Sequence, residues 1–343
     1  DGEIACPGTV DEMSCSTTEY CGQDAQYGWD LSHESQERFS IDGESESVVL
    51  DAHTGLSWQG CSIGQSGSSC SGTGTLMDWH QAVSSCQDLN WGGHDDWRLP
   101  NTHETHGIVD FSTTGPALDT TIFPNPPNLF PEEYDNWWID CVWTSTVYAG
   151  DPSVSQAMML NSGDLSAGSG LEDHPHDQDA EGWDGCSARC VRGGETPSFQ
   201  RFITDNTVPD EKQIIDTQGH RIWQACSAGQ NGTDCTETAT MMNWKSALSY
   251  CQALSWGGHD NWRLPDVKEL MSIVDFNTQF PAINSDFFPN TPFYGIDLND
   301  NNAGQYWSST SREYNDFALY VNFSFGGSHF YIQSENRHVR CVR

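Results

Sequence analysis

The sequence is poor in positive charge. Its 343 residues include 14 Lys and Arg against 49 Asp and Glu, which gives a formal net charge of −35. Nucleic acid, anionic lipid and sulfated polysaccharide would be repelled by this charge, so we exclude them as partners. No apolar run approaches the ~20 residues that a membrane helix needs, so we expect no membrane insertion. The chain starts at Asp1 with neither Met nor an apolar signal segment, and we expect this end to be processed.

Motifs that carry catalysis are also missing. The sequence has no Gly-x-Ser-x-Gly, no His-Glu-x-x-His and no phosphate-binding loop. An enzyme would need an activated nucleophile, an open metal site or a paired acid and base. The sequence therefore predicts a protein that is not an enzyme.

The cysteines are numerous but have no metal-type spacing. The chain has 13 Cys, and none of them forms a CxxC pair. Such usage indicates disulfides in an oxidising compartment, so we predict a secreted or cell-surface protein. Because 13 is odd, at least one Cys is free or pairs with another chain.

An internal repeat is the strongest feature that is present. At an offset of 165 positions, the stretch Trp-Gly-Gly-His-Asp-x-Trp-Arg-Leu-Pro at 91–100 recurs at 256–265. The other identities at this offset include Asp51 with Asp216, Trp58 with Trp223, Cys61 with Cys226, Cys86 with Cys251 and Phe123 with Phe288. Later the offset drifts because loop lengths differ. We predict an acidic, Cys-containing N-terminal tail at 1–33, domain one at 34–194 and domain two at 195–343.

Each copy predicts the same order of elements. Apolar residues from Trp79 to Leu89, and from Trp244 to Leu254, recur at spacings of three and four, which is typical of an amphipathic helix. The pairs Asn101 with Glu104 and Asp266 with Glu269 predict capping boxes of a second helix, which in copy two should extend through Leu270 and Val274. Alternation from Phe317 to Phe323 predicts a strand in a β-rich second half.

These motifs together resemble a known family. The pattern Asp-x-x-Thr-Gly-Leu-x-Trp at 51–58, the helix with its Cys, the repeated Trp-Gly-Gly-His segment, Tyr-Trp-Ser-Ser-Thr at 306–310 and Val-Arg-Cys-Val-Arg at 339–343 are similar to the Lcl C-terminal domain family. The family is named for a bacterial collagen-like surface adhesin. The resemblance implies an α+β fold: two tandem C-type-lectin-like domains, each with two helices and a twisted, mostly antiparallel sheet, related in architecture to formylglycine-generating enzymes.

The resemblance also implies adhesion or polysaccharide binding at a cell surface. The named adhesin binds sulfated glycans through a basic surface, and that ligand does not suit this acidic chain. Copy one also departs from the motif, because 141–146 reads Cys-Val-Trp-Thr-Ser-Thr and an acidic stretch follows near 173–184.

The repeat predicts the cysteine pairing, because equivalent cysteines should pair alike. The expected disulfides are Cys61 with Cys70, Cys86 with Cys190, Cys226 with Cys235, Cys251 with Cys341 and, in copy one alone, Cys141 with Cys186. Cys6, Cys15 and Cys21 remain in the tail. They would leave a thiol for an interchain disulfide or a docking tail; alternatively, they pair with the body of the same chain and other pairings change.

Two oxygen-rich stretches are candidate calcium sites, since Ca²⁺ takes about 6 to 8 oxygen ligands. In copy one the candidates are Asp173, Asp177 and Asp179, and in copy two Asp297, Asn299, Asp300 and Asn302. The alternative is a pair of solvated acidic loops. Neither the Glu-Pro-Asn nor the Gln-Pro-Asp sugar motif is present.

Aromatic residues in the variable stretches are candidate ligand contacts. Trp137, Trp138, Phe293 and Tyr294 could stack on sugar rings, although cores and interfaces use the same residue types. The duplicated Trp97, Arg98 and Pro100, by contrast, favour a structural role as an aromatic anchor, a buried guanidinium and a turn. We expect the same of His94 and His259, as satisfied polar groups beside a Gly-Gly turn.

The sequence thus predicts a non-catalytic binding protein, adhesin- or lectin-like, whose partner is a glycan, another surface ligand or copies of itself. The alternative is a structural subunit of an extracellular fibre or surface array, held by the N-terminal tail. Ca²⁺ is the one cofactor that we expect.

Overall fold

The computed structural model describes residues 38–43, 46–111, 113, 116–126, 141–149, 151–159, 164–166, 185–194, 201–293, 303–311 and 316–343. The described residues divide into two compact units, one that covers 38–194 and one that covers 201–343. We call the first unit domain one and the second unit domain two. The described part contains no helix that is long and apolar enough to cross a membrane.

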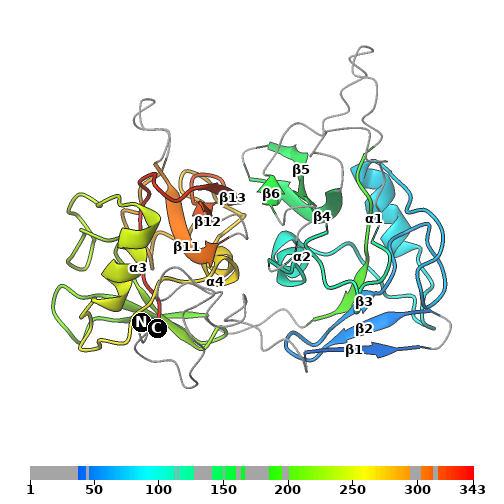
Figure 1. Ribbon diagram of the computed structural model, residues 1–343, viewed down its shortest axis with the longest axis horizontal. Coiled ribbons are helices and arrows are strands. Elements are labelled where there is room, and N and C mark those ends of the chain that lie inside the picture. Colours follow the sequence, from blue (N-terminus) through cyan, green and yellow to red (C-terminus); the bar gives the residue numbers. More distant parts are fainter. Residues whose placement is uncertain are drawn as a thin grey trace, which may run out of the picture. The chain divides into compact units, whose positions relative to one another are not determined.

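Domain one has a small antiparallel sheet, two helices and a set of longer strands (Figure 1). The small sheet has the order β1-β2-β3-β7, from β1 (Phe39–Asp42), β2 (Val48–Asp51), β3 (Leu56–Gln59) and β7 (Val191–Gly193). Helices α1 (Trp79–Gln87) and α2 (Thr102–Gly107) come next, followed by β4 (Cys141–Tyr148), β5 (Asp151–Met159) and β6 (Asp164–Ser166), which pair antiparallel in that order.

Domain two repeats this arrangement. Strands β8 (Phe202–Asp205), β9 (Gln213–Asp216) and β10 (Arg221–Gln224) are followed by α3 (Trp244–Gln252) and α4 (Val267–Ser272). The long strands β11 (Gln305–Ser311), β12 (Phe317–Asn322) and β13 (Gly327–Ile332) again pair antiparallel. The chain's last residues take the place of β7, since the backbones of Ile222 and Arg343 exchange two hydrogen bonds of 3.0 Å.

The helix predictions are confirmed, apart from the ends of the helices. Both second helices start with capping boxes, at Asn101 with Glu104 and at Asp266 with Glu269. Four residues of the predicted α3 stripe, Trp244, Ala247, Leu248 and Cys251, are buried. The last residues of the two stripes, Leu89 and Leu254, are half-buried and lie beyond the ends of α1 and α3. The extension of α4 through Val274 was wrong: the helix ends at Ser272, and Val274 is buried in the turn that follows.

The β-rich half differs from the expected alternation. Of the four alternating residues, Leu319, Val321 and Phe323 are fully buried and Phe317 is half-buried, but Ala318 is also fully buried and Tyr320 nearly so. Strand β12 is therefore covered on both faces, a situation in which polar and apolar residues no longer alternate.

Five disulfides join the pairs that the repeat predicts: Cys61–Cys70, Cys86–Cys190, Cys141–Cys186, Cys226–Cys235 and Cys251–Cys341. Cys251–Cys341 ties α3 to the closing segment, and Cys86–Cys190 does the same for α1. In the chain-entropy account a closed loop of about 100 residues contributes roughly 4.7 kcal/mol. These bonds place the chain in an oxidising compartment.

The Trp-Arg-Leu-Pro segment is structural, but not in the way that we predicted. The indole of Trp262 is buried and its Nε1 donates to the carbonyls of Trp256 and His259. His259 therefore contributes its backbone, while its ring is exposed. The same holds for Trp97 and His94.

The expected buried guanidinium of this segment was wrong. The side chains of Arg98 and Arg263 are 41% and 27% exposed, and they lie over Glu104 and Glu269. The carboxylate is the less exposed member of each pair, since Glu269 is fully buried and Glu104 is 16% exposed.

Glu269 binds two arginines where Glu104 binds one. Its carboxylate accepts from Arg263 at 2.6 and 2.7 Å and from Arg221 at 2.5 Å, and it is fully buried. Domain one has Leu56 in place of Arg221. Burial alone would raise the pKa of Glu269, but the charges and hydrogen bonds of the two arginines lower it to about 2.

We predict that Glu269→Gln destabilises domain two by about 3 kcal/mol, because it leaves two partly buried arginines without a counter-charge. Since the folded-state pKa is depressed, the stabilisation by Glu269 is complete above the unfolded pKa, 4.5, and is lost as the pH falls towards about 2. Urea unfolding between pH 7 and pH 2 measures both effects.

Glu104→Gln is the matched control. Arg98 is nearly half exposed, so this change should cost less than about 1 kcal/mol. Equal losses for the two variants would contradict the assignment of a special role to Glu269.

Candidate functional site

The candidate site is the part of each domain where a turn that both copies share leads into a stretch that differs between them. In domain two the turn is Phe288-Pro289-Asn290, and in domain one it is Phe123-Pro124-Asn125. Both Phe rings are fully buried, and both Asn residues have positive φ, 47° and 45°. Asn tolerates this left-handed conformation better than most residues, which explains its use here.

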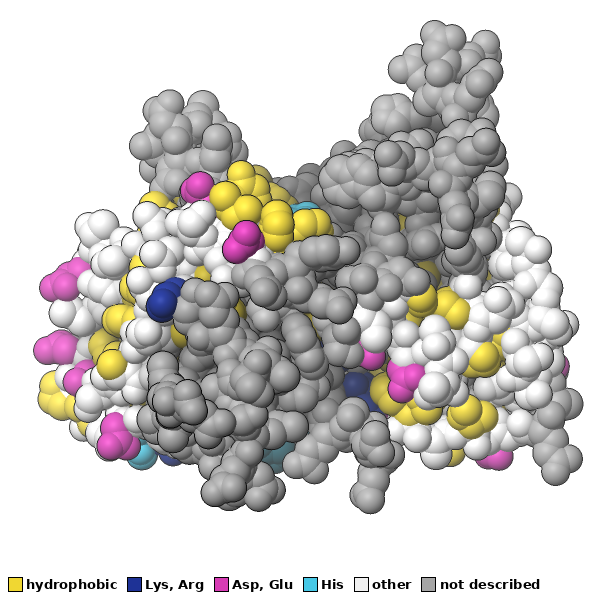
Figure 2. All heavy atoms as spheres, in the orientation of Figure 1, with side chains coloured by type: hydrophobic (Ala, Val, Ile, Leu, Met, Phe, Trp, Pro, Cys, Tyr) yellow, Lys and Arg dark blue, Asp and Glu magenta, His cyan; other side chains and the backbone are white. Residues whose placement is uncertain are grey.

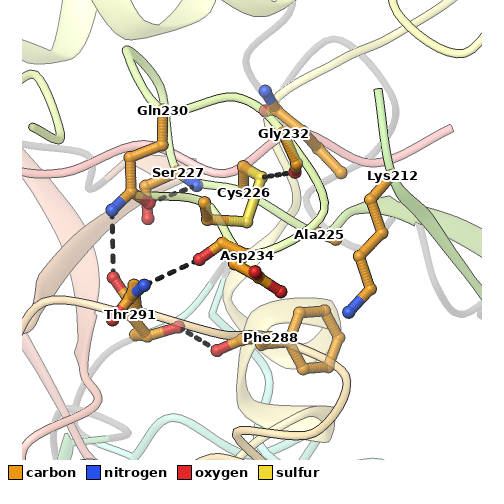
Figure 3. The surroundings of a disulfide bond; sticks show 12 residues. Lys212, Ala225, Cys226, Ser227, Gln230, Gly232, Asp234, Phe288 and Thr291 are labelled. Atoms are coloured by element: carbon orange, nitrogen blue, oxygen red, sulfur yellow. Dashed lines mark hydrogen bonds between the residues drawn. A yellow bond between two sulfur atoms is a disulfide. The ribbon is translucent and has the colours of Figure 1, made fainter. Parts of the chain in front are cut away.

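A glutamine, Gln230, fixes the turn of domain two (Figure 3). The Gln230 Nε2 donates to the carbonyl of Asn290 at 3.0 Å, while its Oε1 accepts from the backbone of Ser227 at 3.0 Å. In return the Asn290 Nδ2 donates to the carbonyl of Asp234 at 2.7 Å. The turn is thus bonded on both sides to the loop that the Cys226–Cys235 disulfide closes.

Domain one has the same anchor. The Gln65 Nε2 donates to Asn125 O at 2.8 Å, its Oε1 accepts from Ser62 N at 3.0 Å, and the Asn125 Nδ2 donates to Cys70 O at 2.7 Å. The anchor is therefore a property of the repeat.

A buried arginine, Arg340, also holds this turn in domain two. We call Gln230, Asn290 and Arg340, with their equivalents Gln65, Asn125 and Arg189, the frame of the turn. The Arg340 Nη2 donates to Thr291 Oγ1 at 2.9 Å, its Nη1 donates to the carbonyls of Gln224 and Ala225, and its guanidinium lies 4.8 Å from the centre of the Phe288 ring. Thr291 Oγ1 in turn donates to Phe288 O at 2.9 Å (Figure 3).

Arg189 plays the same part in domain one. Its Nη1 donates to the carbonyls of Gln59 and Gly60, and its guanidinium lies 4.9 Å from the centre of the Phe123 ring. Full burial lowers the pKa of Arg189 to about 9, so the group remains charged at neutral pH.

The two domains differ beside this arginine. Domain two has Tyr306, fully buried, whose hydroxyl lies 2.5 Å from Ser227 Oγ. Burial raises the pKa of Tyr306, although the charge of Arg340 opposes the shift. Domain one has Val142 at the corresponding position.

Lys212 also lies near the disulfide loop in domain two (Figure 3). Its Nζ donates to Asp286 O at 3.2 Å. Burial lowers its pKa, and the charges of Asp234 and Asp286 oppose this. Domain one has Ser47 instead, so domain two alone carries a cation at this point.

The frame leads directly to the variable stretch of domain two. Phe293 is the last described residue before 294–302, and Ala303 is the first after it. The Ser324 Oγ donates to Ala303 O at 3.3 Å, and Phe323 N donates to Gly304 O at 2.7 Å. Both ends of the stretch are therefore fixed by the core.

Of the predicted ligand contacts, Phe293 lies in the described part. It is half-buried, and its ring centre lies 6.5 Å from that of Phe280. The contacts Trp137, Trp138 and Tyr294 lie outside the described residues. So do all predicted calcium ligands, namely Asp173, Asp177, Asp179, Asp297, Asn299, Asp300 and Asn302. Within the described residues, no group of three or more His, Cys, Asp or Glu could hold a metal.

Sequence reasoning missed the frame itself. Gln65 and Gln230 are identical at the 165-residue offset, as are Asn125 and Asn290. This identity was a usable signal, but nothing in it shows that the two residues of each pair meet.

Comparison with known families gives two matches to one family. The Lcl C-terminal domain matches residues 47–181 and again residues 212–343, one match in each domain. A search of curated proteins finds no match.

We predict that Asn290→Ala destabilises domain two by about 1 to 2 kcal/mol, because it removes the hydrogen bond to Asp234 O and replaces an Asn, which tolerates positive φ, with a residue that tolerates it less well. Asn290→Gly keeps the backbone conformation and should lose about 1 kcal/mol or less. Denaturant unfolding gives the free energies, and hydrogen exchange of 288–293 should speed up in both variants.

Asn125→Ala is the matched variant in domain one and should behave like Asn290→Ala. A neutral effect of both Ala variants would show that the turn does not depend on its Asn anchor.

Proposed function

Because the chain belongs to the Lcl C-terminal domain family through both of its domains, we propose that it is a secreted or cell-surface, non-catalytic binding protein that recognises a glycan or another surface ligand. The observation that carries the proposal is the duplicated frame. The same glutamine, asparagine and arginine hold the same turn in both domains, while the stretches that leave the turn differ in length and sequence. Constant frames that present variable loops are a common basis for recognition.

The cysteines support a role without catalysis. All ten described cysteines are consumed in disulfides, so none of them can act as a nucleophilic thiol. The buried Glu269 and Arg340 are held by internal partners and serve the fold.

The charge supports a ligand without negative charge. On the face drawn in Figure 2, acidic side chains outnumber basic ones over the described surface. Nine of the described arginines are directed at carboxylates, carbonyls or rings of their own domain. An anionic glycan would find few cations to bind.

We predict that the full chain binds neutral glycans on an array in about 0.15 M salt and does not bind sulfated ones. Replacing 294–302 by a Gly-Ser segment of equal length should abolish binding if domain two binds the glycan. The same replacement of 127–140 in domain one is the matched control. An EDTA arm tests the proposed Ca²⁺, since retained binding would remove the metal from the mechanism. Preference for sulfated glycans, or no binding at all, would contradict the proposal.

A second function, assembly into an extracellular fibre or array, is favoured by the cysteine count. Ten of the 13 cysteines pair with one another, which leaves Cys6, Cys15 and Cys21, and three cysteines cannot all pair within one chain. At least one of these three cysteines therefore has no partner among the 13, and we propose that it bonds to another chain. The tail residues themselves lie outside the described part.

We predict covalent dimers or ladders of the native protein on non-reducing gels, which collapse with reductant. The triple variant C6S/C15S/C21S should run as a monomer, with its folded domains unchanged by circular dichroism. A native protein that is monomeric without reductant would rule out covalent assembly.

A further inference from the structure

Phe280 in domain two has a backbone conformation that is unusual for its side chain. Its φ is +52°, in the left-handed region that bulky residues rarely occupy. The other described non-glycine residues with positive φ are Asn125, Asn290, Asp210, His220, Cys70 and Cys235. They are Asn, Asp and His, which are enriched in this region, or cysteines held by a disulfide. Phe280 belongs to neither group.

The fold imposes this conformation, since the backbone around Phe280 is bonded on both sides. Phe280 N donates to Ser324 O at 2.8 Å, Ala282 N donates to Phe323 O at 2.6 Å, and Asp275 N donates to Ala282 O at 3.0 Å. These bonds hold the turn around Phe280, whose peptide bond to Pro281 is cis, and none of them involves the Phe280 side chain.

The sequence of domain one has a glycine at the corresponding position. At the offset of 165 residues, Phe280 corresponds to Gly115 and Phe293 corresponds to Asn128. Glycine adopts positive φ without a steric cost. Domain two instead holds a strained aromatic residue here and a second aromatic residue at the neighbouring position, so both rings are specific to domain two.

The strain is not compensated by burial of the ring. Phe280 is 41% exposed, and its ring packs at 6.5 Å and 54° from Phe293, which is half-buried. Strained residues that persist without a packing reason are candidates for function. Two exposed polar residues, Asn277 and Thr278, lie three and two positions before Phe280 in the sequence.

We propose that Phe280 and Phe293 form an aromatic platform that binds the apolar face of an uncharged pyranose residue. This rests on the proposed glycan-binding function and assigns the ligand class and the domain. Phenyl rings have no polar group and so select the C–H face of a sugar, while nearby amide and hydroxyl groups can bond its hydroxyls. The net charge of −35 disfavours uronic or sulfated sugars. Phe293, one of the two residues of the platform, directly precedes the variable stretch 294–302.

Saturation-transfer NMR on the full chain tests this, with cellotetraose and tetra-N-acetylchitotetraose as neutral probes, a chitosan tetramer as a cationic probe and a heparin tetrasaccharide as an anionic probe. We expect saturation of the neutral probes to be strongest at the C–H protons of one ring face. Phe280→Gly and Phe293→Ala should each weaken the affinity by roughly tenfold or more. Phe280→Tyr keeps a ring and should retain binding.

Stability separates a ligand contact from a structural role. Because glycine relaxes the left-handed strain, Phe280→Gly should have an unchanged or higher Tm while it loses binding. Ile203→Ala, which removes an exposed apolar side chain of β8, is the control and should keep both properties.

The outcomes distinguish the two proposals. If neutral glycans bind and the Phe280 and Phe293 variants bind equally well, the platform is wrong while glycan binding stands. Binding of the chitosan or heparin probe alone would overturn the neutral class. If no saccharide binds, the platform and the glycan-binding function both fall. A clear fall in Tm for Phe280→Gly would make Phe280 a structural residue.

Discussion

The fold of each domain depends on one buried positive charge. The side chains of Arg340 and Arg189 are buried. Each guanidinium donates to backbone carbonyls at the end of a strand of the small sheet. Such a charge is costly to desolvate and is tolerated only when dipoles and rings surround it. The carbonyls, the Phe ring and, in domain two, the Thr291 hydroxyl supply that environment. Because the neighbouring residue is the cysteine that binds the first helix, this charge sets where the helix, sheet and turn meet.

The two domains stabilise one crossing point by different chemistry. In domain one, Met77 pairs with Cys186, which is bonded to Cys141 at the start of β4. In domain two, Met242 pairs with Arg337, whose guanidinium lies 4.3 to 4.7 Å from the ring centres of Trp307, Tyr320 and Tyr331. A covalent link in one copy is thus replaced by stacking of a cation among aromatic rings in the other. The disulfide fits the copy with the longer insertion, where a cross-link removes more freedom from the unfolded chain.

The sequence could predict what depends on local chemistry or on the repeat itself. The capping boxes at Asn101 and Asp266 are local, and the disulfides follow from equivalence of the copies. The Arg98 side chain was misjudged because sequence cannot tell which partner of an ion pair is buried. The contact of Gln230 with Asn290 spans 60 residues and depends on tertiary packing. The positive φ of Phe280 could not be predicted for a similar reason, because this residue lies in a turn that is bonded to the distant segment around Ser324.

The use of arginine inside the domains has a consequence for recognition. Arg38 and Arg201 bond to Asp51 and Asp216, which burial alone would shift to a higher pKa but which the arginines hold below the usual value. Arg189, Arg337 and Arg340 are buried outright. Because most of the described arginines are bound to partners in their own domain, few of the 14 Lys and Arg of the chain are available to an anionic ligand, whereas the chain has 49 Asp and Glu. Recognition by such a surface must then come from shape, stacking and neutral hydrogen bonds, because the surface has too few free cations to attract an anion.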